Sequence, residues 1–428
     1  MSRSEKLYNT LMDNTVLSDF FKPALTALRK VPHRIAHSAS LPMDMFMLAS
    51  CLRHLQGQKS MREQIQYLFH LTDEEQMPIA RSSYSDALNC AVRAAVVQQV
   101  VAELAVLAKE QLPDRLKDIP EIGSRNIYAV DGSYQEESAH YQRVTPKEGG
   151  TDNHKGHMML TFYDVRLGAP IGARIETSNR HELLVLKDEL IAKESCFKKI
   201  KNSLFVVDRA FIHASFWDSL KAKSNTTMIT REKSNFVFTH SIARKIEANS
   251  INEGVTLDEE VGFKASNSAW RRVVYKAPNG NDYVFITNDF TLSPGVIAFL
   301  YLRRWDEEKC FDTWKNDFSS SKAWAKSKSG IYQQVLFVIM TTLLTKMFSQ
   351  RHESILAVED EKCFNKQETL SDLKVNTGKE RRPWYQDLYR ATAKTSKQII
   401  RFIKMCFLKR SCHRLYEREL KPMFLSYL

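Results

Sequence analysis

The sequence predicts a mixed α/β fold, in which a sheet with a β-rich insertion lies between a helical N-terminal and a helical C-terminal region. Residues 41–55 and 87–112 are rich in Ala, Leu, Val and Gln and contain few Gly or Pro, which favours helices. Short apolar runs separated by turn residues begin after Pro120. From Ser293 onward the pattern is largely helical again.

Three apolar runs predict the leading strands of the sheet, and their order favours a meander. The next strand, 203–207, is apolar at nearly every position, as expected for a sheet that is covered on both faces. A helix is predicted before this strand and another after it. The predicted elements are strand 126–130, two strands within 157–176, helix 179–192, strand 203–207, a helix to about 223 and strand 227–230.

A β-rich insertion is predicted over about 235–288, with a hairpin turn at 278–281. Its predicted strands are 235–239, 270–275 and 282–287. The resulting division of the chain is a helical region over 1–120, which could bind DNA or support the fold, a central domain over 121–350 and a basic helical region over 351–428.

The charge of the chain favours a polyanionic partner. Net charge is +12, and residues 371–428 contain 14 Lys and Arg against 5 Asp and Glu. Clustered cations bind phosphate backbones and release counterions, so this asymmetry points to nucleic acid. The total charge alone is equally compatible with an ordinary basic protein.

The cysteines and the apolar segments favour a cytoplasmic protein with no membrane partner. Seven cysteines are scattered along the chain without a CxxC pair, which suits a reducing compartment. No signal peptide is expected from the polar start of the sequence. The most apolar stretch, Val335 to Leu344, is too short to span a bilayer and predicts a buried helix.

Two aspartates are predicted at the carboxyl ends of buried strands. Asp131 follows the strand 126–130, and Asp208 follows the strand 203–207. Functional groups gather at such strand ends in α/β sheets. An aspartate there can also simply start a turn or cap a helix, and each residue taken alone leaves both interpretations open.

A third carboxylate occurs on a predicted helix over 301–315. At about 100° per residue, Tyr301, Arg304, Glu308 and Lys315 share an arc of about 60° on one face. The alternative is a solvated face with ordinary salt bridges, which accounts less well for the aromatic residues of this segment.

Three carboxylates from distant parts of a chain suit phosphodiester chemistry. Cleavage and strand transfer develop negative charge on the attacking and leaving oxygens, and two divalent ions about 4 Å apart can stabilise both. Mg²⁺ prefers oxygen ligands and keeps several waters, so a few carboxylates suffice. Cationic residues such as Arg304 and Lys315 could then hold the phosphates of the scissile strand.

These segments resemble one large group of bacterial insertion-sequence transposases of the DDE type. Tyr301, Arg304, Glu308 and Lys315 match the Y-x2-R-x3-E-x6-K (YREK) signature of that group. The other matching segments, in chain order, are Asp131-Gly132-Ser133, Asp208-Arg209-Ala210-Phe211 and Thr287-Asn288-Asp289. The group more often has Thr at position 133 and Gly at position 210.

The resemblance implies a ribonuclease-H-like fold and a catalytic, metal-binding triad of Asp131, Asp208 and Glu308. It also implies two Mg²⁺ ions, which Mn²⁺ can replace, and work on terminal inverted repeats and target DNA by a homodimer in a synaptic complex. A bacterial, nucleoid-associated protein of the cytoplasm is expected. Asp306 and Glu307 compete for the third position, and the signature register selects Glu308.

Other residues are predicted to contact DNA. Tyr301, Arg304 and Lys315 share the face of Glu308, and Arg209 follows Asp208. Trp270 lies in the insertion between a polar turn and two arginines, where an aromatic ring could stack on a flipped base. The alternative for Trp270 is packing within the insertion itself.

Two other functions remain open from the sequence. A ribonuclease-H-like nuclease without strand transfer would share the same triad. A non-catalytic DNA-binding descendant would be expected to have lost a triad or signature residue, and none is missing here.

Overall fold

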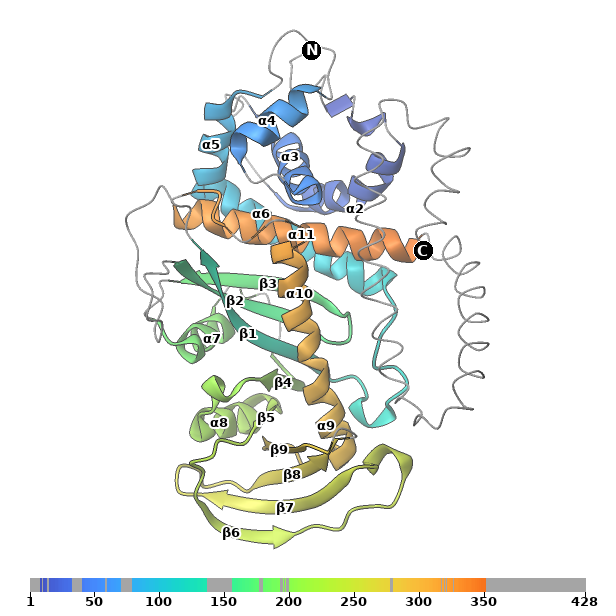
Figure 1. Cartoon of the computed structure of the whole chain (residues 1–428), viewed down its shortest axis with the longest axis vertical. Helices are drawn as coiled ribbons and strands as arrows, with labels where there is room; N and C mark the ends of the chain where they lie inside the picture. The colour runs from blue at the N-terminus through green and yellow to red at the C-terminus, as the bar shows by residue number, and fades with distance from the viewer. Residues whose placement is uncertain are drawn as a thin grey trace. The chain divides into compact units, whose positions relative to one another are not determined.

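The structure is a computed structural model. The chain forms two compact units. One unit contains Pro113–Thr313, and the other contains Met1–Leu112 together with Trp314–Leu428. Figure 1 shows the elements of both units. The residues described are 8–9, 11–13, 15–32, 41–57, 60–70, 79–136, 156–176, 180–192, 195, 197, 200–277, 280–316, 318, 320, 322–325 and 327–351.

In the unit that contains both ends of the chain, the described residues are mainly helical. Its long helix α11 packs against α6, α3 and α2 within this unit. Aromatic side chains pack between these helices. The ring centroid of Phe337 is 5.2 Å from that of Phe46, and the ring centroid of Phe348 is 5.8 Å from that of Phe20. The helices are α2 (Thr15–Lys30), α3 (Met43–Gln56), α4 (Met61–His70), α5 (Arg81–Asn89), α6 (Ala91–Gln111) and α11 (Lys328–Arg351).

The predicted buried helix at Val335 to Leu344 is confirmed as the centre of α11, where every residue of that stretch is buried. By length and composition α6 and α11 could each cross a membrane, but 89% of the most apolar window of α11 is buried inside the protein. The predicted domain boundaries at residues 120 and 350 remain predictions. The C-terminal region predicted over 351–428 lies outside the described residues, apart from Arg351.

The second unit is built on one nine-stranded sheet with the strand order β3-β2-β1-β4-β5-β9-β8-β7-β6. Its strands are β1 (Asn126–Glu136), β2 (Gly156–Asp164), β3 (Ala169–Glu176), β4 (Ser203–Val207), β5 (Thr227–Arg231), β6 (Phe238–Ala243), β7 (Val255–Phe263), β8 (Trp270–Lys276) and β9 (Asp282–Thr287). Its helices are α7 (Glu182–Ile191), α8 (Ala214–Ser224), α9 (Pro294–Arg303) and most of α10 (Trp305–Asn316), with short 3₁₀ turns η1 (Pro120–Ile122), η2 (Arg209–Phe211) and η3 (Ser250–Asn252).

The strand pairing confirms the predicted meander and the ribonuclease-H-like arrangement. β1, β2 and β3 pair antiparallel, whereas β4 pairs parallel with β1 and β5 pairs parallel with β4. Parallel neighbours require a crossover, and α7 and α8 supply these two connections. The mixed sheet with flanking helices is therefore the one that the sequence predicts.

The predicted insertion continues this same sheet. β9 pairs antiparallel with β5, and β8, β7 and β6 follow in antiparallel order. Strand β7 was not predicted from the sequence, because its acidic run Asp258-Glu259-Glu260 interrupts the apolar pattern. The structure explains these acids by pairing, since Asp258 and Glu259 bind Arg271 and Arg272 of the neighbouring strand β8.

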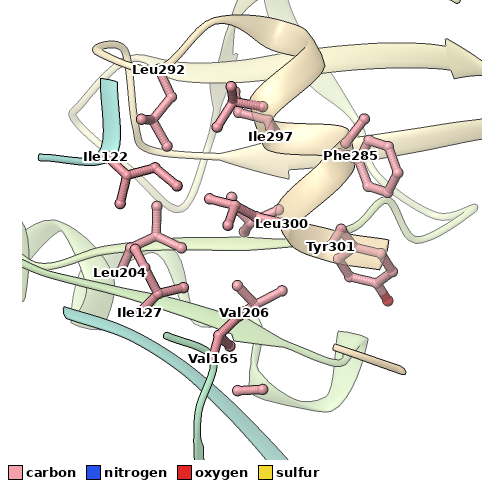
Figure 2. Packing of buried hydrophobic residues seen from close by; sticks show 14 of the residues in the cluster. Ile122, Ile127, Val165, Leu204, Val206, Phe285, Leu292, Ile297, Leu300 and Tyr301 are labelled. Atoms are coloured by element: carbon pink, nitrogen blue, oxygen red, sulfur yellow. The ribbon is translucent and has the colours of Figure 1, made fainter. Parts of the chain in front are cut away.

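The apolar core of this unit lies between the sheet and α9. Every second residue of the parallel strands faces this core. Ile127, Leu204 and Val206 are examples, and they pack with Ile297 and Leu300 of α9 (Figure 2). The intervening residues of the strands point to the other face. There Phe205 lies 5.7 Å from Trp217 of α8, so the sheet is covered on both sides, as the apolar strand β4 predicts.

The segment Thr287-Asn288-Asp289, which leads from β9 towards α9, is buried and forms several hydrogen bonds. Asn288 accepts a hydrogen bond from the backbone N–H of Met228 in β5. Asp289 accepts from Thr227 in β5 and forms an ion pair of 2.6 Å with Arg125 at the start of β1. These contacts fix the loop that leads into α9 and hence the position of the residues that follow α9.

Replacing Asp289 with alanine is expected to lower the free energy of unfolding by about 3–5 kcal/mol, because it leaves the buried guanidinium of Arg125 without its carboxylate. Burial alone would raise the pKa of Asp289, but Arg125 and Thr291 lower it to about 2. The stabilisation is therefore complete above about pH 4 and is lost as pH falls through about 2. Urea unfolding between pH 2 and 7 measures both effects.

The exposed Asp282 of β9 provides the matched control. Asp282→Ala should leave the pH profile of unfolding unchanged. Equal unfolding free energies for Asp289→Ala and the wild type would contradict this role of Asp289.

Candidate active site

The register of the parallel strands brings Asp131 and Asp208 together. β1 and β4 pair in parallel as far as Val130 and Val207, and each aspartate is the residue that directly follows this last pair. Side chains along a strand point alternately to the two faces of the sheet. Asp131 therefore shares a face with Ile127 and Ala129, and Asp208 shares a face with Leu204 and Val206. Both aspartates therefore belong to the face of the sheet that α9 covers.

One detail of the prediction for Asp131 is wrong. The strand does not end at Asp131 but continues to Glu136, with Asp131 opposite Thr161 of β2. The apolar pattern ends at Val130 because only the pairing with β4 ends there, while the antiparallel pairing with β2 goes on. Asp208 does follow the end of its strand, at the start of η2.

The third predicted carboxylate, Glu308, reaches the same place from α10. The helix predicted over 301–315 is divided at Arg304, where α9 ends and α10 begins. Arg304 donates to Asp131 Oδ2 at 2.9 Å and to Glu308 Oε1 at 2.6 Å. Its guanidinium thus bridges two of the three carboxylates while its side chain is only 8% exposed.

The charges at this site act on one another. Burial raises the pKa of Asp131, Arg304 and the amide of Gly132 lower it, and Asp208 and Glu308 add to the rise. The three carboxylates therefore interact electrostatically, although they lie more than 70 residues apart in sequence.

The three consecutive acids of α10 have different surroundings. Asp306 pairs with Arg303 at 2.9 Å, so its charge is already balanced. Glu307 is completely buried, and burial together with Asp131 raises its pKa well above the usual value. The side chain of Glu308 is 33% exposed and can meet a ligand from solvent.

A fourth carboxyl, Glu182, was not predicted from the sequence. It is the first residue of α7, and burial, Asp131 and Asp208, in this order, raise its pKa to about 7. The only sequence signal is its place at the start of a helix that follows the meander, which is common for acids.

The donor chemistry of these residues fits a divalent cation, since carboxylate oxygens are the ligands that Mg²⁺ prefers. Arg304 contacts both Asp131 and Glu308. Among the described residues there is no group of three His, Cys, Asp or Glu side chains that could hold a metal ion. A cation bound by both Asp131 and Glu308 would compete with the guanidinium of Arg304 for these carboxylates.

Residues 123–344 match the model of the family described as Transposase DDE domain. The match covers just over half of the 428 residues. The chain belongs to the Transposase DDE domain family. Divalent metal ions are general in this family, which agrees with the donor chemistry above.

The solved structures that resemble this chain include one of a transposase complex. The cryo-EM structure of a piggyBac transposase synaptic complex with hairpin DNA is similar to this transposase with 9% sequence identity and a TM-score of 0.42. The similarity covers 100% of this chain and 86% of that chain. No curated protein matches the sequence.

The other residues of this transposase that are predicted to contact DNA, Tyr301, Arg209 and Lys315, differ in their exposure to solvent. Tyr301 is beside Arg304, whose Cζ lies 5.5 Å from the ring centroid. The Tyr301 ring is 4% exposed and packs at 5.0 Å from Phe285, at the edge of the core (Figure 2). Arg209 lies partly exposed in η2 next to Asp208, and Lys315 is exposed near the end of α10.

Trp270 does not offer a free face for a base. It is 1% exposed, its indole N–H donates to Asp218 and Ser266, and its ring packs 5.5 Å from Phe263. Strand alternation points position 270 inward, towards α8. Trp270 therefore packs against Phe263 and Ser266 of the insertion and against Asp218 of α8, and base stacking by Trp270 stays a prediction.

Proposed function

We propose that this transposase binds the terminal inverted repeats of its mobile element and catalyses DNA strand cleavage and strand transfer. We also propose that it belongs to the YREK-signature group of bacterial insertion sequences and acts on the nucleoid in the cytoplasm. Two copies would hold the paired DNA ends in a synaptic complex.

The observation that carries this proposal is the meeting of Asp131 and Asp208 where the parallel ladder of β1 and β4 ends. Two carboxylates on one face of a sheet, with Glu308 bound to the same arginine as Asp131, are the donors that phosphodiester chemistry needs.

Asp131, Asp208 and Glu308 would hold two Mg²⁺ ions, and Mn²⁺ should replace them. The ions would supply charge stabilisation for the attacking and leaving oxygens. Arg304 then exchanges a carboxylate for a DNA phosphate, which a guanidinium can hold through two hydrogen bonds. Tyr301 supports Arg304 from the core, and Lys315 and Arg209 are proposed to contact phosphates of the same strand.

Joined DNA products test the function. The full chain is incubated with Mg²⁺, a DNA fragment ending in the inverted repeat that flanks the gene, and a supercoiled target plasmid. We expect covalent joining of the fragment to the plasmid. Cleavage without joining would favour the ribonuclease-H-like nuclease instead, and specific binding without cleavage would favour a non-catalytic descendant.

The basic C-terminal segment should make DNA binding strongly dependent on salt. Residues 371–428 carry a net charge of +9 and lie outside the described residues. Each phosphate contact contributes about 0.9 to the slope of log affinity against log salt concentration. Changing Lys394, Lys397, Lys404 and Lys409 together to glutamine should flatten this slope by about 2–4.

The matched control changes the same four lysines to arginine, which keeps the charge and should keep the slope. Fluorescence anisotropy with the inverted-repeat DNA, measured at several salt concentrations, gives both slopes. An unchanged slope in the glutamine variant would mean that these charges do not meet DNA.

A further inference from the structure

Glu182 occupies the space where a side chain at position 132 would lie. A Cβ placed on Gly132 would be 1.9 Å from Oε1 of Glu182. Such a distance is far below van der Waals contact, so even alanine at position 132 would displace the carboxyl. The glycine that follows Asp131 in β1 therefore makes room for an acid from α7.

The position of Glu182 is fixed by the fold. α7 packs against β2 and against η2, the turn that directly follows Asp208. Glu182, the first residue of α7, thus lies against Gly132 of β1, and α7 packs on the turn that follows Asp208. The charges that act on Glu182 are those of Asp131 and Asp208, and both repel it.

A second buried acid near Asp131 gives an independent observation. Glu307 of α10 is 0% exposed, and among the described residues its carboxyl has no side-chain hydrogen-bond partner, only the backbone of Asp131. Among the neighbouring charges, Asp131 raises the pKa of Glu307 most. Asp131 thus interacts with carboxyls of α7 and α10 and with Asp208, and Arg304 is the cation that contacts it.

We propose that Glu182 is a fourth carboxylate of the metal centre and binds a divalent cation together with Asp131 and Asp208. This inference rests on the proposed function, because it assumes that Asp131 and Asp208 hold the same ion. The role of Gly132 follows, since only glycine leaves room for the carboxyl beside Asp131. The alternative is a purely structural role, in which Glu182 stabilises the start of α7 through the helix dipole.

Calorimetric titration of the metal-free full chain with Mn²⁺ tests the proposal without relying on activity. Glu182→Gln keeps the shape of the side chain and removes its charge, and we expect Mn²⁺ affinity to fall on the order of 10–100-fold. Gly132→Ala should weaken binding in the same way by displacing Glu182. Asp188→Asn, an exposed acid of the same helix, is the control and should bind as the wild type does.

Two further measurements separate the possible failures. Unchanged Mn²⁺ binding by Glu182→Gln, with binding lost in Asp131→Asn, would overturn the role of Glu182 alone. Unchanged binding in both variants would overturn the proposed metal centre as well. The thermal midpoint of metal-free Glu182→Gln should equal or exceed that of the wild type, because a repelling charge is removed, whereas a lowered midpoint would support the structural role and contradict ours.

Discussion

Replacing Asp131 with asparagine is expected to lower DNA end cleavage by at least about 10³-fold while the fold remains intact. Asparagine keeps the size of the side chain but not the negative charge that a divalent cation needs. Asp208→Asn should have an equal effect, because the parallel register places the two residues as neighbours at the end of the same ladder. Single-turnover cleavage of an inverted-repeat fragment measures both losses.

Asp312 offers a matched control for this prediction. It is an exposed acid of α10, one helical turn beyond Glu308, and it is not one of the three predicted metal ligands. Asp312→Asn should cleave DNA at nearly the wild-type rate. Near-normal cleavage by Asp131→Asn or Asp208→Asn would contradict the assignment of the triad.

Replacing Arg304 with alanine is expected to destabilise the metal-free protein by about 2–3 kcal/mol. The substitution leaves Asp131 and Glu308 without their shared cation, and Asp131 is only 19% exposed. The expected loss is smaller than the about 3–5 kcal/mol of a fully buried pair because Glu308 is a third exposed. Urea unfolding in EDTA measures this loss, and Mg²⁺ should restore part of it by taking the place of the guanidinium charge.

Two comparisons make the result for Arg304 specific. Lys264→Ala removes a cation from an exposed position of the same unit and should leave stability unchanged. Arg304→Lys keeps the charge but not the two-pronged geometry, so it should recover part of the stability and little of the cleavage. A loss below about 1 kcal/mol for Arg304→Ala would instead support an ordinary salt-bridged helix face.

The sequence predicted the parts of the site that depend on local pattern. Asp131 and Asp208 follow apolar runs, and adjacent parallel strands that end at the same level must bring such residues together. Glu308 followed from helical spacing, although the helix is in fact divided at Arg304. The continuation of β1 beyond Asp131 was missed because the ladder with β2 is not visible in an apolar pattern that ends at Val130.

Other features depend on long-range packing and could not be predicted. The bridge from Arg304 to Asp131 requires the junction between α9 and α10 to lie beside Asp131 of β1, which no spacing along the chain reveals. Glu182 looks like an ordinary acid at a helix start until the register places it against Gly132. Trp270 was given a role in DNA binding because its neighbours are basic, yet strand alternation points it into the protein.

The measurement that tests the central claim most directly is anomalous diffraction from crystals of the full chain grown with Mn²⁺. The proposed site requires Mn²⁺ peaks in contact with Asp131, Asp208 and Glu308, with Arg304 turned away from at least one of its two carboxylates. Peaks confined to other parts of the protein, with Arg304 still bridging Asp131 and Glu308 at saturating Mn²⁺, would contradict it.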